Sequence, residues 1–190
     1  MNSTLRPALI LSLLLSLVTG LAYPLLVSGV AHVAMPFQAG GSIVQRDVKA
    51  VGSLLIWQSF NDPKHFWGRP SATSPGPNNA IASGGSNQGP SNPALVDAVK
   101  GRIDALRAAD PDNKAPVPID LVTASGSGLD PEISIAAARY QADRIARARG
   151  LPVERVNALV AERAKGRLLG FLGEPRVNVL ELNLALDSIR

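Results

Sequence analysis

The longest apolar stretch of the chain lies near its N-terminus. Arg6 is the only charged residue among the first 45, and residues 7–31 form an uncharged, mostly apolar run. A helix needs about 20 apolar residues to cross a hydrocarbon core about 30 Å thick, whereas the apolar part of a secretory signal has roughly 7–15. The pattern therefore predicts one transmembrane helix over residues 7–30.

A cleaved signal peptide is the alternative, because Gly20-Leu21-Ala22 is a small-x-small triplet that a peptidase could use. The apolar run continues past this triplet to Val27, which favours an uncleaved anchor. The tail of residues 1–6 carries Arg6 and no acid, so the positive-inside rule predicts a cytoplasmic tail. Residues 31–190 would then form one extracytoplasmic, periplasmic domain.

Helical signals dominate the second half of the chain. Asn92-Pro93 predicts a capped helix that stops before Asp110. Ser134 predicts the start of a second helix, which runs to about Arg149 and is terminated by Gly150. A third helix follows Pro152.

The C-terminal segment allows two interpretations. Asn178 followed by Glu181 resembles a capping box and predicts a helix after a short strand that ends near Val177. The alternation of leucines over residues 180–186 would suit a strand instead. We expect the helix.

Strand signals are few. The candidates are residues 42–44, residues 51–57 and the segment 117–123, which is typical of a buried strand. Residues 61–93 lack periodicity and are rich in Pro, Gly, Ser and Asn, which predicts a long irregular segment. The expected fold is a mixed α/β domain with few strands and three to four helices, behind one transmembrane helix.

Composition excludes several classes of function. The net charge is +4, aromatics make up 4% of residues, and there is no cysteine. Without a dense basic run or interleaved aromatics, nucleic-acid binding is not expected. The absence of cysteine excludes disulfides, Fe–S clusters, thiolate zinc sites and a cysteine nucleophile.

Catalytic and metal-binding patterns are weak. His32 and His65 are the only histidines, and His65 with Asp62 makes neither a recognisable metal site nor a catalytic triad. We expect a loop histidine that orders its surroundings, no catalytic residues and no metal site.

Two glycine-rich loops, residues 82–87 and 125–130, lack the Lys-Ser/Thr that completes a phosphate loop. They are expected to be turns with positive φ, or backbone surfaces pressed against a partner. Residues 139–176 hold nine Lys/Arg against four Asp/Glu. A solvated basic face is the simplest interpretation, and docking on anionic lipid headgroups or an acidic partner surface is the alternative.

Several short motifs follow one another along the chain. They are Arg6-Pro7-Ala8, Tyr23-Pro24-Leu25-Leu26, Gly68-Arg69-Pro70-Ser71-Ala72-Thr73, Ala82-Ser83-Gly84-Gly85-Ser86-Asn87, Ser91-Asn92-Pro93, Leu121-Val122-Thr123-Ala124-Ser125, Ser127-Gly128-Leu129-Asp130, and Asn178 followed by Glu181-Leu182-Asn183-Leu184-Ala185-Leu186-Asp187. In their order and spacing, these motifs resemble the C subunit of Kdp-type potassium-transporting P-type ATPases. The resemblance covers essentially the whole sequence.

The resemblance implies a non-catalytic subunit of a bacterial inner-membrane complex that imports potassium at the expense of ATP. Its partners would be a channel-like subunit, an ATP-hydrolysing P-type subunit and a small single-span subunit, together with the lipid bilayer. The family is described as needed for assembly and as a catalytic chaperone that raises the pump subunit's affinity for ATP. A nucleotide-binding role linked to a glutamine would fall on Gln141.

The position of Gln141 argues for a different role. By helical spacing it lies beside Ala138 and Ile145, which favours a structural hydrogen bond at the edge of the core. The predicted topology also separates it from cytosolic ATP by the bilayer. Any effect on ATP affinity would then arise by coupling between conformational states.

Overall fold

The computed structural model describes residues 2–189, so the outermost residues of the predicted tail and domain lie outside it. The chain divides into two compact units, Met1–Val51 and Gly52–Arg190. Each unit is described by itself.

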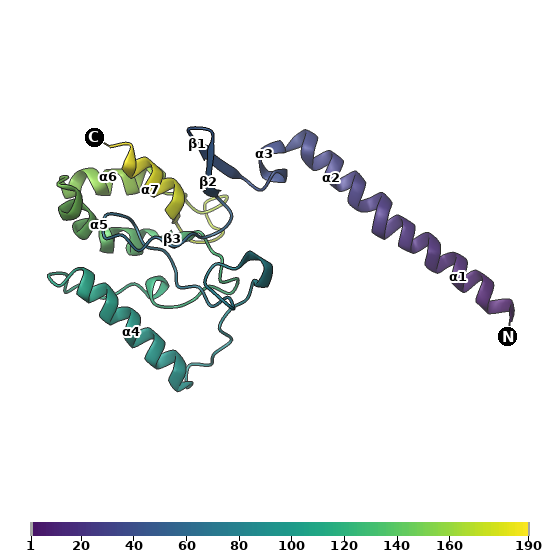
Figure 1. Ribbon diagram of the computed structural model, residues 1–190, viewed down its shortest axis with the longest axis horizontal. Helices are drawn as coiled ribbons and strands as arrows, with labels where there is room; N and C mark the ends of the chain where they lie inside the picture. Colours follow the sequence, from purple (N-terminus) through teal and green to yellow (C-terminus); the bar gives the residue numbers. More distant parts are fainter. Residues whose placement is uncertain (1, 190) are drawn as a thin grey trace. The chain divides into compact units, whose positions relative to one another are not determined.

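The first unit is dominated by one long helix. It consists of α1 (Asn2–Leu17), a π-helical turn (Val18–Ala22) and α2 (Tyr23–Ala34) (Figure 1). Within the described residues, Thr4–Ala34 is the one helix long and apolar enough to cross a membrane. The helix extends beyond the predicted span of residues 7–30 at both ends, and which of its residues lie in a membrane stays a prediction.

The π-helical turn accommodates a proline. Pro24 has no N–H, so it cannot donate a hydrogen bond to the carbonyl four residues earlier in the helix. Immediately before it, the Tyr23 N–H bonds the Val18 carbonyl five residues back. A single π-helical turn of this kind is a common way for an α-helix to continue past a missing hydrogen bond.

A short helix, α3 (Pro36–Ala39), leads into a two-stranded sheet of β1 (Ile43–Arg46) and β2 (Lys49–Ser53). The strand predicted over residues 51–57 lies earlier in the chain, because β2 begins at Lys49 and ends at Ser53. Beyond Ser53 the backbone no longer pairs with β1. The Trp57 N–H instead donates to the Leu129 carbonyl at 2.8 Å, and the Trp57 ring is buried.

Up to residue 189, the second unit has four α-helices and one small sheet, which confirms the mixed α/β class with few strands. The helices are α4 (Pro93–Ala109), α5 (Ile135–Arg149), α6 (Val153–Arg163) and α7 (Val179–Asp187). The strands β3 (Glu132–Ser134) and β4 (Arg176–Asn178) pair antiparallel, with Ile133 opposite Val177. Two 3₁₀ turns, η2 (Ala80–Ala82) and η3 (Ile119–Leu121), interrupt the irregular segments.

The predicted helix ends are confirmed by their caps. The side chains of Asn92, Ser134 and Asn178 accept backbone N–H groups of the first turns of α4, α5 and α7. Gly150 ends α5 in the left-handed conformation with φ +66°. Such caps satisfy N–H groups that the helix itself leaves without partners, which is why the sequence located these ends well.

The predicted strand over residues 117–123 is wrong. The segment forms the 3₁₀ turn η3, although Leu121 and Val122 are buried as expected. Pro116 precedes the segment and Pro118 lies within it. Prolines lack the N–H that a sheet ladder needs, so burial here comes from a turn.

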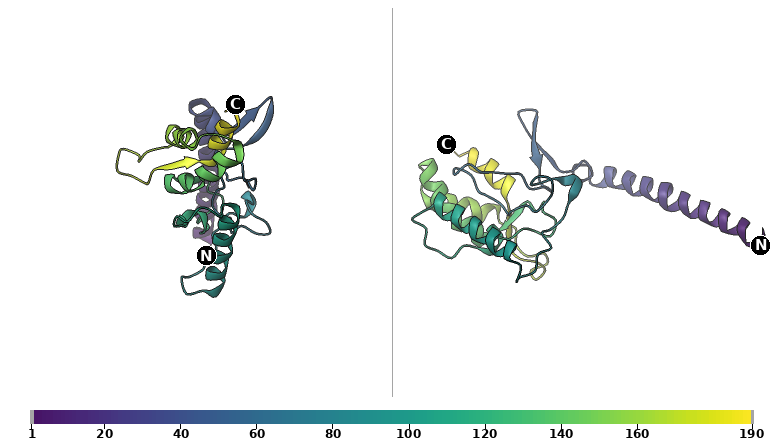
Figure 2. Two further views of the ribbon diagram at one scale, coloured as in Figure 1. Left: turned by 90° about the vertical axis from the view of Figure 1, so that its left-hand side faces the viewer. Right: turned by 60° about the horizontal axis from the view of Figure 1, so that its bottom comes forward.

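The core lies where α5, α6 and α7 pack together over β3 and β4. Ile145, Val156, Val160, Leu182 and Leu186 have no exposed surface. The helix α4 has Leu106 as its one buried residue, and its C-terminal end lies next to α5 (Figures 1 and 2). The irregular segment before α4 fills the remaining space, which brings residues 57–71 against the core.

Candidate functional site

Two buried amide side chains hold the loop of residues 62–67, which we call the clamped loop. Gln141 of α5 accepts the Trp67 N–H at 2.8 Å and donates to the Trp67 carbonyl at 3.0 Å. Asn183 of α7 makes the same pair of bonds with Phe66, at 2.8 and 3.0 Å. Both amides are about 1% exposed, and both are satisfied, as buried polar groups must be.

Arg144 of α5 extends this arrangement to the start of the loop. Its guanidinium donates to the carbonyls of Pro63 and His65 and to the Gln141 side-chain oxygen, and it lies 4.4 Å from the centroid of the Trp67 ring. Burial lowers the pKa of Arg144 to about 10, against the opposing effects of two carboxylates. The group therefore stays charged at neutral pH, and it binds the loop as a cation.

His65 closes the other side of the clamped loop. Its Nε2 lies 3.1 Å from Asp187 Oδ1, and its Nδ1 lies 3.9 Å from Asp62. The same Asp187 oxygen accepts from Arg149 at 2.6 Å. His65 bonds no serine among residues 2–189, and that part of the chain holds no cluster of three metal-binding side chains. The histidine orders its surroundings, as the sequence suggested.

The Asp187 pair makes a prediction for acid stability. Partial burial acts to raise the pKa of Asp187, but hydrogen bonds and charges of Arg149 and His65 together outweigh it, so the pKa lies below its usual 3.8. Since the folded pKa is depressed, this stabilisation is complete above the unfolded pKa and is lost as pH falls through the lower folded value. The difference in unfolding free energy between wild type and Asp187→Asn should therefore be fully present at about pH 5 to 6.

That difference should shrink as the pH falls below about 4, where both proteins carry an uncharged side chain. Urea unfolding at a series of pH values measures it. A difference that grows as the solution becomes more acidic would contradict the assigned pKa direction.

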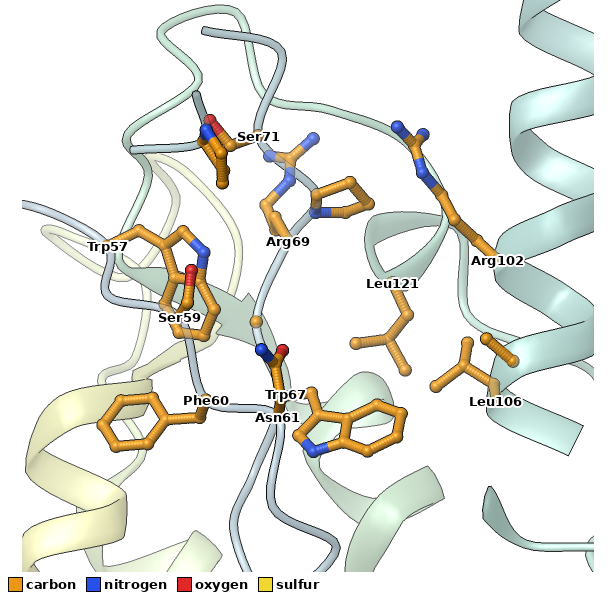
Figure 3. Close-up of a pocket in the computed structure, with 14 residues that line it drawn as sticks. Trp57, Ser59, Phe60, Asn61, Trp67, Arg69, Ser71, Arg102, Leu106 and Leu121 are labelled. Atoms are coloured by element: carbon orange, nitrogen blue, oxygen red, sulfur yellow. The ribbon is translucent and has the colours of Figure 1, made fainter. Parts of the chain in front are cut away.

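A pocket of about 340 Å³ opens beside the clamped loop (Figure 3). Trp57, Phe60 and Trp67 supply aromatic walls, and Trp57 and Phe60 lie 5.8 Å apart between ring centroids. Two guanidinium groups, those of Arg69 and Arg102, also line it. Such a pocket suits an apolar or planar group that carries negative charge.

Both pocket arginines are anchored by backbone carbonyls. Arg102 donates to the Val122 carbonyl at 2.7 Å, and burial lowers its pKa. Arg69 bonds Asp130 at 3.0 Å and the Ala124 carbonyl at 3.3 Å. Among residues 2–189 no acceptor faces the buried Arg69 Nε. The pocket therefore holds two guanidinium groups in fixed positions, and the charge of Arg69 is balanced by Asp130.

The two glycine-rich loops pack against each other. The Gly84 N–H donates to the Ser127 carbonyl at 2.8 Å, so the group that a phosphate loop would direct at an anion is used inside the protein. A Cβ on Gly85 would lie 3.2 Å from the Gly126 carbonyl oxygen. Gly128 has the expected positive φ, whereas Gly84 and Gly85 do not and instead permit the close approach of the two loops.

Gly128 should be the most sensitive of these positions. Its φ is +68°, and an added Cβ would lie 2.7 Å from the Gly84 carbonyl oxygen. Gly128→Ala should therefore lower the free energy of unfolding by roughly 1–3 kcal/mol, from backbone strain and displacement of the other loop. Gly89→Ala, in open space at a φ outside the left-handed region, is the matched control and should change it little. Equal stability of the two variants in urea unfolding would show that the loops do not meet.

The basic face expected over residues 139–176 is solvated in most places but not everywhere. The exposed cations are Arg139, Arg147, Arg155, Arg163, Lys165 and Arg167. Arg144 is buried and Arg149 pairs with Asp187, and the exposed Arg147 pairs with Asp110. The structure therefore corrects the simplest interpretation for Arg144 and Arg149, which connect α5 to segments distant in sequence.

Gln141 makes the structural hydrogen bonds expected at the edge of the core, and its suggested nucleotide role stays a prediction. The role of Asn183 and the aromatic pocket were not predicted from the sequence. An asparagine inside a run of leucines, as at residues 182–186, was the available signal, because an amide among apolar neighbours needs specific partners.

Comparison with known proteins gives one consistent result. A family model described as "K+-transporting ATPase, c chain" matches residues 5–188. A potassium-transporting ATPase KdpC subunit of Variovorax paradoxus is 68% identical over 188 residues, which are 99% of this chain and 97% of the relative. Similar proteins of the same name from Polaromonas naphthalenivorans and Methylibium petroleiphilum are 66% and 63% identical over 190 residues, all of this chain and 97% and 100% of the relatives.

Proposed function

This chain belongs to the family of C chains of K+-transporting ATPases, and on that premise we propose that it is the membrane-anchored assembly subunit of a potassium import pump. It holds together a channel-like subunit, a P-type subunit that hydrolyses ATP and a small single-span subunit. The match over residues 5–188 is the observation that carries the proposal.

Anchoring rests on the helix Thr4–Ala34. Its large apolar side chains are exposed, for example Leu9 at 62% and Leu25 at 68%. Such surface is unfavourable in water and is covered by lipid in a membrane. The secreted binding protein considered as an alternative has no support, since the relatives are named as ATPase subunits. We propose a bacterial inner-membrane location with a cytoplasmic N-terminus and a periplasmic domain, following the positive-inside rule.

For ATP we propose an indirect role. Gln141 is about 1% exposed and its amide is engaged by Trp67 and Arg144, which supports a structural function for the side chain. The subunit would bind one conformational state of the pump better than another, and would raise ATP affinity by shifting their populations. Photolabelling by an ATP analogue added to the cytoplasmic side of sealed vesicles tests this. Labelling of Gln141 itself would overturn both the indirect role and the topology.

The anchor is tested by deleting residues 2–34 and purifying the complex through a tag on another subunit. The full chain should co-purify with the tagged subunit, and the deletion variant should be absent from the purified complex. The reason is that the helix both attaches the chain to the membrane and packs against helices of other subunits there. Replacing residues 8–30 by an unrelated apolar helix separates these two contributions. A deletion variant recovered in wild-type amount, or a mature chain that begins near Tyr23, would contradict the proposal.

Sidedness has its own test, because the chain contains no cysteine. A single cysteine at Ser74 or Ser86 should react with a membrane-impermeant thiol reagent in intact spheroplasts. Reaction only after lysis would place these residues in the cytoplasm and refute the proposed orientation.

A further inference from the structure

A hairpin between α6 and β4 carries four large apolar side chains at its turn. These residues, which we call the apolar tip, are Leu168, Leu169, Phe171 and Leu172, exposed by 65%, 76%, 70% and 46%. The hairpin projects from the body of the second unit (Figure 2). Four exposed hydrophobic side chains within five residues form a contiguous patch, which in soluble proteins marks an interaction site.

The hairpin is an ordered element with its own hydrogen bonds. Lys165 and Arg176 exchange backbone bonds of 2.8 and 3.0 Å at its base. Leu168 and Leu172 exchange two bonds of 2.9 Å at the turn, and the Phe171 N–H bonds the Leu168 carbonyl. The tip therefore presents side chains from a backbone that largely satisfies itself.

The chemistry of the tip matches a lipid bilayer better than a protein pocket. From residue 168 to residue 173 the sequence LLGFLG has no polar side chain that a partner could recognise by hydrogen bonding. Hydrocarbon tolerates a backbone only where its N–H and C=O groups are bonded internally, and the turn meets that demand at Leu168 and Leu172.

Three cationic side chains precede the apolar tip in the sequence. Arg163, Lys165 and Arg167 are each close to half exposed, and Arg167 bonds Glu174 at 2.8 Å while Lys165 lies 3.4 Å from Glu181. Such exposed pairs are weak and exchange readily. The long side chains can therefore reach lipid phosphates while the leucines enter the acyl boundary.

We propose that the apolar tip inserts into the surface of the bilayer and forms a second, peripheral membrane contact of the same subunit. The inference rests on the proposed anchoring, because a tethered domain meets the bilayer at high effective concentration, so that even weak insertion is populated. The ligand is the phospholipid interface, with the tip in the acyl boundary and the cations at the phosphates.

Spin labels on single cysteines test this in the full-length chain, reconstituted in phosphatidylcholine vesicles with phosphatidylglycerol. One label replaces Phe171, one replaces Ser16 within the long helix, and one replaces Ile81, an isolated apolar residue that is 98% exposed. Collisions with oxygen report hydrocarbon, and collisions with a polar nickel chelate report water. Labels at 171 and 16 should collide severalfold more with oxygen relative to nickel than the label at 81.

A second variant makes the result specific. Leu168→Ser with Leu169→Ser should return the label at 171 to a water-like ratio, whereas the label at 16 should be unchanged. A water-like label at 171 beside a lipid-like label at 16 would overturn the inference and leave anchoring intact. A water-like label at 16 would overturn the anchoring proposal.

Two further outcomes would overturn the inference. A lipid-like label at 81 would show that the domain contacts lipid at sites other than the apolar tip, so that the contact is not specific to the tip. A label at 171 that is shielded from both colliders in the assembled complex would show that another subunit covers the tip.

Discussion

Phe66→Ala should lower the free energy of unfolding of the second unit by about 3–5 kcal/mol, the usual cost of emptying a fully packed aromatic site. Phe66 has no exposed surface. Its N–H and carbonyl are both bonded to Asn183, so the backbone cannot move inward to fill the space. The cavity should therefore persist and keep the cost near the upper part of the range.

Urea unfolding followed by tryptophan fluorescence measures this effect in the full chain in detergent, because both tryptophans, Trp57 and Trp67, lie in the second unit. Phe171→Ala is the matched control. Its side chain is 70% exposed, and its loss should change stability by no more than about 0.5 kcal/mol. Similar values for the two variants would mean that Phe66 does not belong to the core.

Arg144→Ala should cost on the order of 3 kcal/mol, since it leaves buried acceptors without their charged donor. The Pro63 and His65 carbonyls and the Gln141 oxygen all lose a bond, and Trp67 loses the cation over its ring. Arg144→Lys should recover only part of the loss, because an ammonium group cannot reach three acceptors in the geometry of a planar guanidinium.

The same helix provides the comparison for this variant. Arg139 is exposed, so Arg139→Ala should change the unfolding free energy by about 0.5 kcal/mol or less. Urea denaturation curves of Arg144→Ala, Arg144→Lys and Arg139→Ala give the unfolding free energies to be compared. If removal of Arg139 proved as costly as removal of Arg144, the stabilisation would come from the overall charge of α5 and not from the clamped loop.

Local chemistry explains which parts of the fold the sequence could predict. The ends of α4, α5 and α7 are set by capping side chains and by Gly150, all within a few residues of the helix they delimit. The capping box at Asn178 outweighed the alternation of leucines that suggested a strand. Because these signals act over one helical turn, a single sequence contains them.

The parts that the sequence did not predict depend on distant partners. The segment 117–123 has the apolar composition of a buried strand, but Pro118 within it has no N–H to donate to a neighbouring strand, and its Asp120 side chain instead accepts the Ser134 N–H at 2.7 Å. Asn183 acquires its role from Phe66, 117 residues earlier in the chain. Gln141 could be placed at the edge of the core from helical spacing, but its partner Trp67 lay beyond any local pattern.

The bonds from Asn183 to Phe66, and from Asn178 to the Leu54 carbonyl 124 residues away, also have a consequence for biosynthesis. A ribosome releases the chain from its N-terminus, so α7 emerges after α4, α5 and α6. Phe66 consequently waits until the chain has grown by the 117 residues that separate it from Asn183. Until then the aromatic side chains of this segment lack the contacts that bury them in the folded domain, and transiently exposed apolar surface of this kind promotes aggregation.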